Sequence, residues 1–251
     1  MDRDVVDFPK ESGSTGGLFP TTHWSLVLAA GDSRNPTARQ ALATLCETYW
    51  SPVYVLIRCR GYDLDEARDL TQSFFLKILE HGSLKVASPD RGRFRAFLRT
   101  TLRNYLIDER LREGTQKRGG ESPRLPLDLA ETEASLAVEL ARDRDPEKAF
   151  EIRWARTLLS RALDRLRAEL EQSADAGRWR RLEPLLTGDS HSGTYQEIAR
   201  ELEMTESAVK VAVHRLRKRY GEALRAEVAQ TVSSKEEVDD EVRYLLAVVD
   251  S

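Results

Sequence analysis

Apolar residues recur every three or four positions through most of the chain, a pattern that predicts amphipathic helices. The clearest face starts after Pro146 and comprises Phe150, Trp154, Leu158, Ala162, Leu166 and Leu170. Similar faces predict further helices over residues 21–30, 38–58, 63–80, 93–112 and 178–186. Pro52 is expected to kink or divide the second of these. No strand-like alternation appears, so the sequence predicts an all-α fold.

The stretch from Thr194 to Tyr220 predicts two short helices around a tight turn. Thr194 is placed to cap the first helix, and Glu197 three residues on completes a capping box. The turn falls near Glu203, and Thr205 is placed to cap a second helix that is rich in Arg and Lys. A helix-turn-helix lays such a second helix in the DNA major groove. A helical hairpin with a solvated basic face is the alternative that this stretch leaves open.

The predicted helices fall into two groups. Between about 113 and 145 the periodicity fails and Gly and Pro gather, which is typical of a linker between domains. We therefore expect two helical domains joined by a flexible linker. The expected parts are a flexible tail over 1–20, a helical domain over 21–112, the linker over 113–145, a helix-turn-helix domain over 146–226 and an acidic extension over 227–251.

Charge is distributed unevenly along the chain, which matters more to a polyanion than the formal net charge of −3 over 251 residues. From Arg91 to Arg118, nine basic residues stand against three acids. From Glu227 to the end, seven acids stand against two basic residues. A basic stretch and an acidic tail are therefore available to different partners.

Several other classes of protein lack support in the sequence. Cys46 and Cys59 show no metal-ligand spacing and are expected to be buried thiols, which favours a cytoplasmic location. No secretory signal and no apolar run long enough to span a membrane is present. Because no HExxH, GxSxG or Gly-rich phosphate loop occurs, we expect no enzyme activity, no cofactor and no metal.

Two motifs in a fixed order connect these features to a known family. Residues 69–79, Asp-Leu-Thr-Gln-Ser-Phe-Phe-Leu-Lys-Ile-Leu, followed by the Arg-rich residues 94–110, resemble conserved region 2 of the sigma-70 family. Residues 195–217 resemble region 4, and nothing between them resembles region 3. The chain is thus similar to the extracytoplasmic function (ECF) group of bacterial RNA polymerase sigma factors.

The resemblance implies a function and partners. The chain would bind core RNA polymerase, through the β′ clamp helices and the β flap, and direct transcription initiation at promoter DNA with −10 and −35 elements. An anti-sigma factor is a further partner that the resemblance admits, and no membrane contact is expected. The alternative function is a stand-alone helix-turn-helix regulator, which would leave the region 2 motifs unexplained.

The resemblance also implies roles for individual residues. The residues expected to contact the polymerase clamp are Asp69, Leu70, Gln72 and Phe75, although Phe75 is alternatively a core residue. The residues expected at the −10 element are Arg93, Arg95, Arg99 and Arg103 on phosphates, and Asn104, which is alternatively an ordinary surface residue. The residues expected at the −35 element are Lys210, His214 and Arg215, with Thr205 and Ser207 near phosphates.

Two departures from the family pattern stand out. Glu203 occupies a turn position where the family often has Gly, and a positive φ there costs about 1 kcal/mol. The acidic tail contains Val238, Val242, Leu245, Leu246 and Val249, a pattern that favours an amphipathic helix. One hypothesis is that this helix folds back on the basic surface or on region 4 and limits DNA binding until the polymerase displaces it. The alternative is a solvated helix that caps the bundle.

Overall fold

The structure, a computed structural model, describes residues 38–80, 93–113, 145–172, 176–187, 194–232 and 234–250. These residues form helices and turns without any strand, so the all-α prediction is confirmed. The helices are α2 (Ala38–Cys59), α3 (Leu64–Glu80), α5 (Phe94–Glu113), α7 (Pro146–Glu171), α8 (Ala176–Thr187), α9 (Tyr195–Glu201), α10 (Glu206–Ala229) and α11 (Val238–Val249). The predicted tail over 1–20, the helix over 21–30 and the linker interior over 114–144 lie outside the described residues.

Local sequence signals account for most helix boundaries. Gly61, with a φ of +94°, turns the chain after α2. The side chain of Asp63 then accepts a hydrogen bond from the Glu66 amide at 2.8 Å, and the Asp63 amide donates to the Glu66 carboxylate at 3.1 Å. This reciprocal cap starts α3. Asp145 caps α7 by accepting a hydrogen bond from the Glu147 amide at 2.9 Å, with Pro146 in the first turn.

Pro52 does not divide its helix. The α2 helix continues from Ala38 to Cys59 with Pro52 inside it. The five residues that follow Pro52, numbers 53–57, are completely buried in the core. Their packing outweighs the cost of one missing backbone hydrogen bond, because most helix stability in a folded protein comes from tertiary packing.

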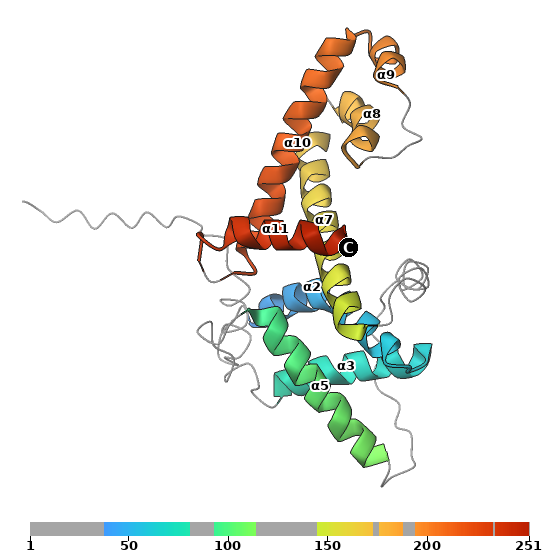
Figure 1. The fold of residues 1–251 in the computed structure, drawn as a ribbon, viewed down its shortest axis with the longest axis vertical. Coiled ribbons are helices and arrows are strands. Elements are labelled where there is room, and N and C mark those ends of the chain that lie inside the picture. Colours follow the sequence, from blue (N-terminus) through green and yellow to red (C-terminus); the bar gives the residue numbers. More distant parts are fainter. Residues whose placement is uncertain are drawn as a thin grey trace, which may run out of the picture.

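A first hydrophobic core lies where six helices meet. It contains buried residues from α2, α3 and α5, from the first half of α7, from the end of α10 and from α11. Trp154 and Leu158 of α7 are fully buried in this core. In Figure 1, α7 and α10 run side by side along the long axis, α2, α3 and α5 gather at one end, and α11 crosses the long pair.

A second core lies at the other end of the long helix pair. It joins the last turns of α7 to α8, α9 and the first half of α10, around Trp179, Ile198 and Val213. The α7 helix therefore contributes to both cores. Helices from either side of residues 114–144 share the first core, while the predicted division of the chain into two domains stays a prediction.

Candidate nucleic-acid interface

The helix-turn-helix begins with the predicted capping box. The Thr194 hydroxyl accepts a hydrogen bond from the Glu197 amide at 3.2 Å. In return, the Thr194 amide donates to the Glu197 carboxylate at 2.6 Å, which lowers the pKa of that carboxyl. Thr205 caps α10 by accepting from the Ala208 amide at 3.2 Å. Thr205 thus has a structural role at the start of the second helix.

The turn between α9 and α10 adopts a left-handed conformation at Glu203, whose φ is 53°. The Met204 amide donates to the Ala199 carbonyl at 2.8 Å, and the Glu203 amide donates to the Arg200 carbonyl at 3.4 Å. This is the Schellman arrangement, in which Gly is the usual residue at the position of Glu203. The predicted positive φ at this turn is confirmed.

One face of the first turns of α10 is buried and the opposite face is exposed. Val209, Val213 and Leu216 lie in the second core. The predicted DNA-reading residues Ser207, Lys210 and His214 are exposed. Lys210 pairs with Glu206 at 2.6 Å, on the solvent side of the helix. The first turns of α10 thus present a short polar row to solvent, opposite the second core.

Val211 belongs to the same exposed face, and sequence reasoning missed it. Its side chain is 50% exposed, between Lys210 and His214 in sequence and opposite the buried Val209 and Val213. An exposed valine is an unusual choice on a helix whose other outward residues are polar. The helical period of 3.6 residues places Val211 opposite the core face. The exposure of Val211 could have been predicted from this period in the sequence.

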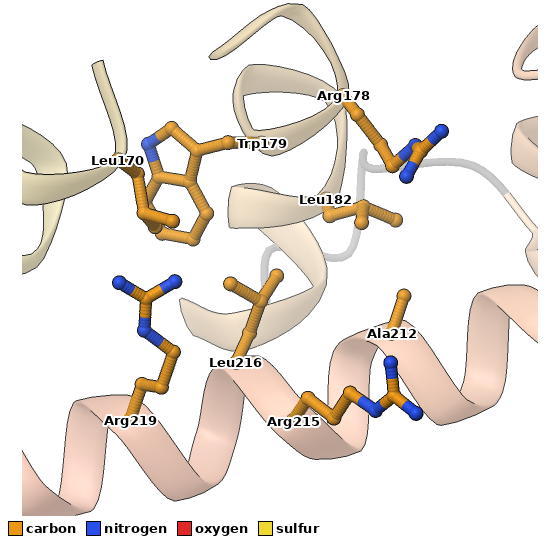
Figure 2. A pocket seen from close by; sticks show the side chains of 8 residues that line it. All are labelled: Leu170, Arg178, Trp179, Leu182, Ala212, Arg215, Leu216 and Arg219. Carbon is orange, nitrogen blue, oxygen red and sulfur yellow. The ribbon is translucent and has the colours of Figure 1, made fainter. Parts of the chain in front are cut away.

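Arg215 lies at the edge of this face, beside a pocket between α8 and α10. The pocket has a volume of about 270 Å³ and an apolar floor that includes Trp179, Leu182 and Leu216. Figure 2 shows Arg178, Arg215 and Arg219 around it, with the Arg215 side chain extending along α10 near Ala212. Arg219 pairs with Glu169 at 2.7 Å. Arg215 is exposed and has no ion-pair partner within the described part of the chain.

The predicted −10 arginines on α5 are engaged by carboxylates of the same chain. Arg95 is buried, and its Nε lies 3.0 Å from Glu151 of α7. Arg93 and Arg95 both pair with Glu241 of α11. Arg99 pairs with Glu151 at 2.6 Å and with Glu147 at 3.3 Å. Burial lowers the pKa of Arg95, and the Glu151 carboxylate acts in the opposite direction.

The second half of α5 carries the remaining predicted −10 residues, and both are exposed. Arg103 has no ion-pair partner among the described residues. Asn104 lines a small pocket between α3 and α5, beside Lys77 and Asp108. Three of the predicted −10 residues, the arginines at the start of α5, are therefore paired with carboxylates. The other two, Arg103 and Asn104, lie one to three turns further on and are exposed.

The predicted polymerase contacts on α3 are also divided between surface and core. Asp69 is exposed and Leu70 is half-buried, whereas Gln72 and Phe75 are each 7% exposed. Phe75 stacks on Trp50 with ring centroids 5.8 Å apart, which fits its alternative role as a core residue. Leu76, which sequence reasoning missed, is 41% exposed, and the helical period places it on the face of Asp69.

The acidic extension contains the expected amphipathic helix, α11. Leu245 is fully buried, and Val238, Val242 and Val249 pack against the first core. Leu246, which belonged to the predicted apolar set, is 46% exposed instead, because it lies at the edge of the buried face. The α11 helix packs on α7 and α10, and none of the described helices is long and apolar enough to cross a membrane.

Comparison with known proteins adds one finding. The family model described as ECF sigma factor matches residues 60–226, which is more than half of the chain. The match starts at the end of α2 and ends within α10, so it includes α3, α5 and the helix-turn-helix but not α11. No curated protein and no solved structure is significantly similar to the chain.

Proposed function

The chain belongs to the ECF sigma factor family, and we propose that it binds core RNA polymerase and directs initiation at promoters with −10 and −35 elements. A role in transcription initiation follows from the family. The single observation that carries the finer proposal is the exposed polar row of Ser207, Lys210 and His214 on the second helix of a helix-turn-helix.

At the −35 element we assign base reading to the exposed row on α10. Lys210 and Arg215 carry the donors that guanine edges and phosphates accept, and His214 lies between them. Val211 adds an apolar contact that fits a thymine methyl group. Ser207 lies in the first turn of α10, where backbone amides and the helix dipole favour a phosphate.

At the −10 element we assign the surface of α5. Arg103 and Asn104 are available for DNA. Arg93 and Arg95 would add phosphate contacts once Glu241 is displaced, whereas Arg99 stays paired with Glu147 and Glu151 of α7. Capture of unpaired bases as the duplex breathes needs no hydrolysis, in keeping with a family of transcription factors rather than enzymes.

For polymerase binding we assign the face of α3 that carries Asp69 and Leu76, with Leu70 beside it. An exposed leucine beside a carboxylate suits a contact that combines apolar burial with charge pairing. Gln72 and Phe75 are buried, so they would support the exposed face of α3 from the core side of the helix. Contacts with the β flap and with an anti-sigma factor, and action in the cytoplasm, stay predictions.

The test is promoter-specific transcription by purified core polymerase with and without the chain. Start sites mapped after overexpression would supply candidate promoters. We expect initiation at defined start sites only when the chain is present, and co-elution of the chain with core polymerase. Absence of both would contradict the proposal.

The alternative function is a stand-alone helix-turn-helix regulator. That protein would bind its site on duplex DNA equally well without polymerase, through α10 alone. The same experiment separates the two, because a regulator would bind DNA but would not make core polymerase start at a new site. The exposed Leu76 of α3 favours the sigma factor.

A further inference from the structure

A fully buried carboxylate lies in the middle of the apolar face of α11. Glu241 has no exposed surface, and it shares its face with Leu245, which is also fully buried one turn further on. Burying a charged carboxylate is unfavourable unless charged or polar partners compensate for the lost water. The position of Glu241 therefore depends on what faces it.

What faces Glu241 is the start of α5. Its carboxylate pairs with both Arg93 and Arg95. The Arg95 guanidinium also lies between two aromatic rings, 4.4 Å from the Trp154 centroid and 4.7 Å from the Tyr244 centroid. Tyr244 comes from α11, so this helix supplies both a charge partner and one of the two rings that hold the guanidinium.

The carboxylates of α7 complete the arrangement. Glu151 lies 3.0 Å from Arg95 and 2.6 Å from Arg99, and Glu147 lies 3.3 Å from Arg99. We call Arg93, Arg95 and Arg99 the α5 arginines. Three carboxylates from two helices occupy them with the oxygen–guanidinium geometry that a phosphate would use.

We infer that α11 is an internal competitor for the DNA backbone: Glu241 and Tyr244 hold Arg93 and Arg95 in the free chain, and these two arginines bind phosphates only when α11 has left. This inference rests on the proposed function in one respect, namely that α5 faces DNA. The same guanidinium groups cannot hold Glu241 and a phosphate at once. Phosphate binding by Arg93 and Arg95 and docking of α11 are therefore mutually exclusive.

The structure also indicates why α11, rather than α7, is the part that leaves. The α7 helix contributes Trp154 and Leu158 to the first core, so it cannot move without unfolding it. The α11 helix has 12 residues, its N-terminus has no side-chain cap, and its pairing of Asp239 with Arg225 is exposed. A short helix without a side-chain cap opens at lower cost than a long helix in the middle of the core.

The test compares two variants that change the same charge on the same helix. Glu241→Gln removes the buried carboxylate, and Asp240→Asn is the matched control, because Asp240 is exposed and, among the residues that the structure describes, pairs with Arg243 one turn away. The probe is a mixed-sequence single-stranded DNA of about 20 nucleotides, since phosphate contacts do not depend on sequence. Binding is measured with the full chain over a series of salt concentrations.

We expect Glu241→Gln to bind the probe about tenfold more tightly, which corresponds to a wild-type chain that is about one-tenth open. We expect the log–log salt slope of Glu241→Gln to match that of the wild type, because both chains bind with the same arginines on phosphates. Asp240→Asn should match the wild type in affinity as well. Equal behaviour of the two variants would overturn the inference.

Hydrogen exchange of the α11 amides gives an independent readout. Added DNA should speed exchange in α11 of the wild-type chain, and Glu241→Gln should show fast exchange without DNA. DNA binding that leaves α11 protected would overturn the inference. Should Glu241→Gln fold poorly, Leu245→Ala serves instead, because it removes a buried anchor of α11 and leaves every charge in place.

These outcomes are separate from those of the proposed function. If the chain fails to direct transcription but Glu241→Gln still gains affinity for the probe, the sigma factor proposal fails and the competition by α11 stands. If transcription is directed but both variants match the wild type on the probe, the competition by α11 fails and the sigma factor proposal stands.

Discussion

Glu203 and Arg95 show how single residues depart from the preferences of their type. Glu203 holds a φ of 53°, and the Schellman hydrogen bonds around it fix the angle between α9 and α10. Arg95 is a buried guanidinium that Glu151, Glu241 and two rings compensate. The positive φ of Glu203 adds strain to the local backbone. The buried guanidinium of Arg95 instead connects three helices through its tertiary contacts.

Glu203→Gly should stabilise the chain by about 1 kcal/mol, because Gly adopts a positive φ without the clash of a Cβ. Chemical denaturation of the full chain measures this. Arg200→Gly, at an exposed helical position in α9, is the matched control and should destabilise by about 1 kcal/mol. A loss of stability in Glu203→Gly would show that its side chain compensates for the strain.

Arg215→Ala should cost about 1–3 kcal/mol on the −35 site that the chain recognises and relax the base preference there. Duplex binding to that site and to single-base variants of it measures both effects. The control is Lys218→Ala, which should weaken binding equally on all sequences, as expected for a phosphate contact. Uniform weakening in Arg215→Ala would assign Arg215 to the backbone instead.

Helices α3 and α11 show that one element can serve core and surface at once. On α3, Phe74 and Ile78 fill the core while Asp69 and Leu76 remain on the outer face. On α11, the buried face combines apolar residues with Glu241. In both helices the period of 3.6 residues separates the two roles, so the outer residues can change without loss of packing.

Leu76→Ala should weaken binding to core polymerase several-fold with little change in stability, because the side chain is 41% exposed. Leu64→Ala is the matched control: Leu64 is 40% exposed on the same helix but lies at its first turn, on another face. Affinity for immobilised core polymerase measures the effect. Equal losses in both variants would remove Leu76 from the proposed contact.

Across the whole molecule, α7 is the helix that links the two ends. Its first half packs on α2 and its second half on α8 and α10, and it contributes to both cores. Glu227 of α10 adds pairs with Arg161 at 3.2 Å and Arg165 at 3.4 Å of α7. Damage to the middle of α7 should therefore affect helices that lie far apart in the sequence.

Leu158→Ala should destabilise the chain by about 2–5 kcal/mol, because it leaves a cavity at a fully buried position between α7 and its neighbours. Thermal unfolding followed by far-UV circular dichroism and by tryptophan fluorescence measures the loss. Glu171→Ala, at the exposed end of the same helix, should change stability by less than about 0.5 kcal/mol. A small effect of Leu158→Ala would mean that the core collapses around the missing atoms.

Much of the fold could be read from local patterns. The helix types, the buried face of α7, the capping box at Thr194 and the cap at Thr205 are all confirmed, because each depends on residues within one or two turns of one another. The family, too, follows from motifs within single helices. The predicted division of α2 at Pro52 was wrong, because the packing of residues 53–57 in the core outweighs the tendency of proline to break a helix.

The sequence by itself determined that the chain is helical, where a helix-turn-helix lies and which helix is rich in arginine. Only the tertiary structure decided which of those arginines are engaged. The α5 arginines meet Glu147, Glu151 and Glu241; the partners lie 52 residues apart in the Arg99–Glu151 pair and 146 apart in the Arg95–Glu241 pair. No local rule specifies such pairs, because they arise from how whole helices pack, and burial strengthens the pair of Arg95 with Glu241.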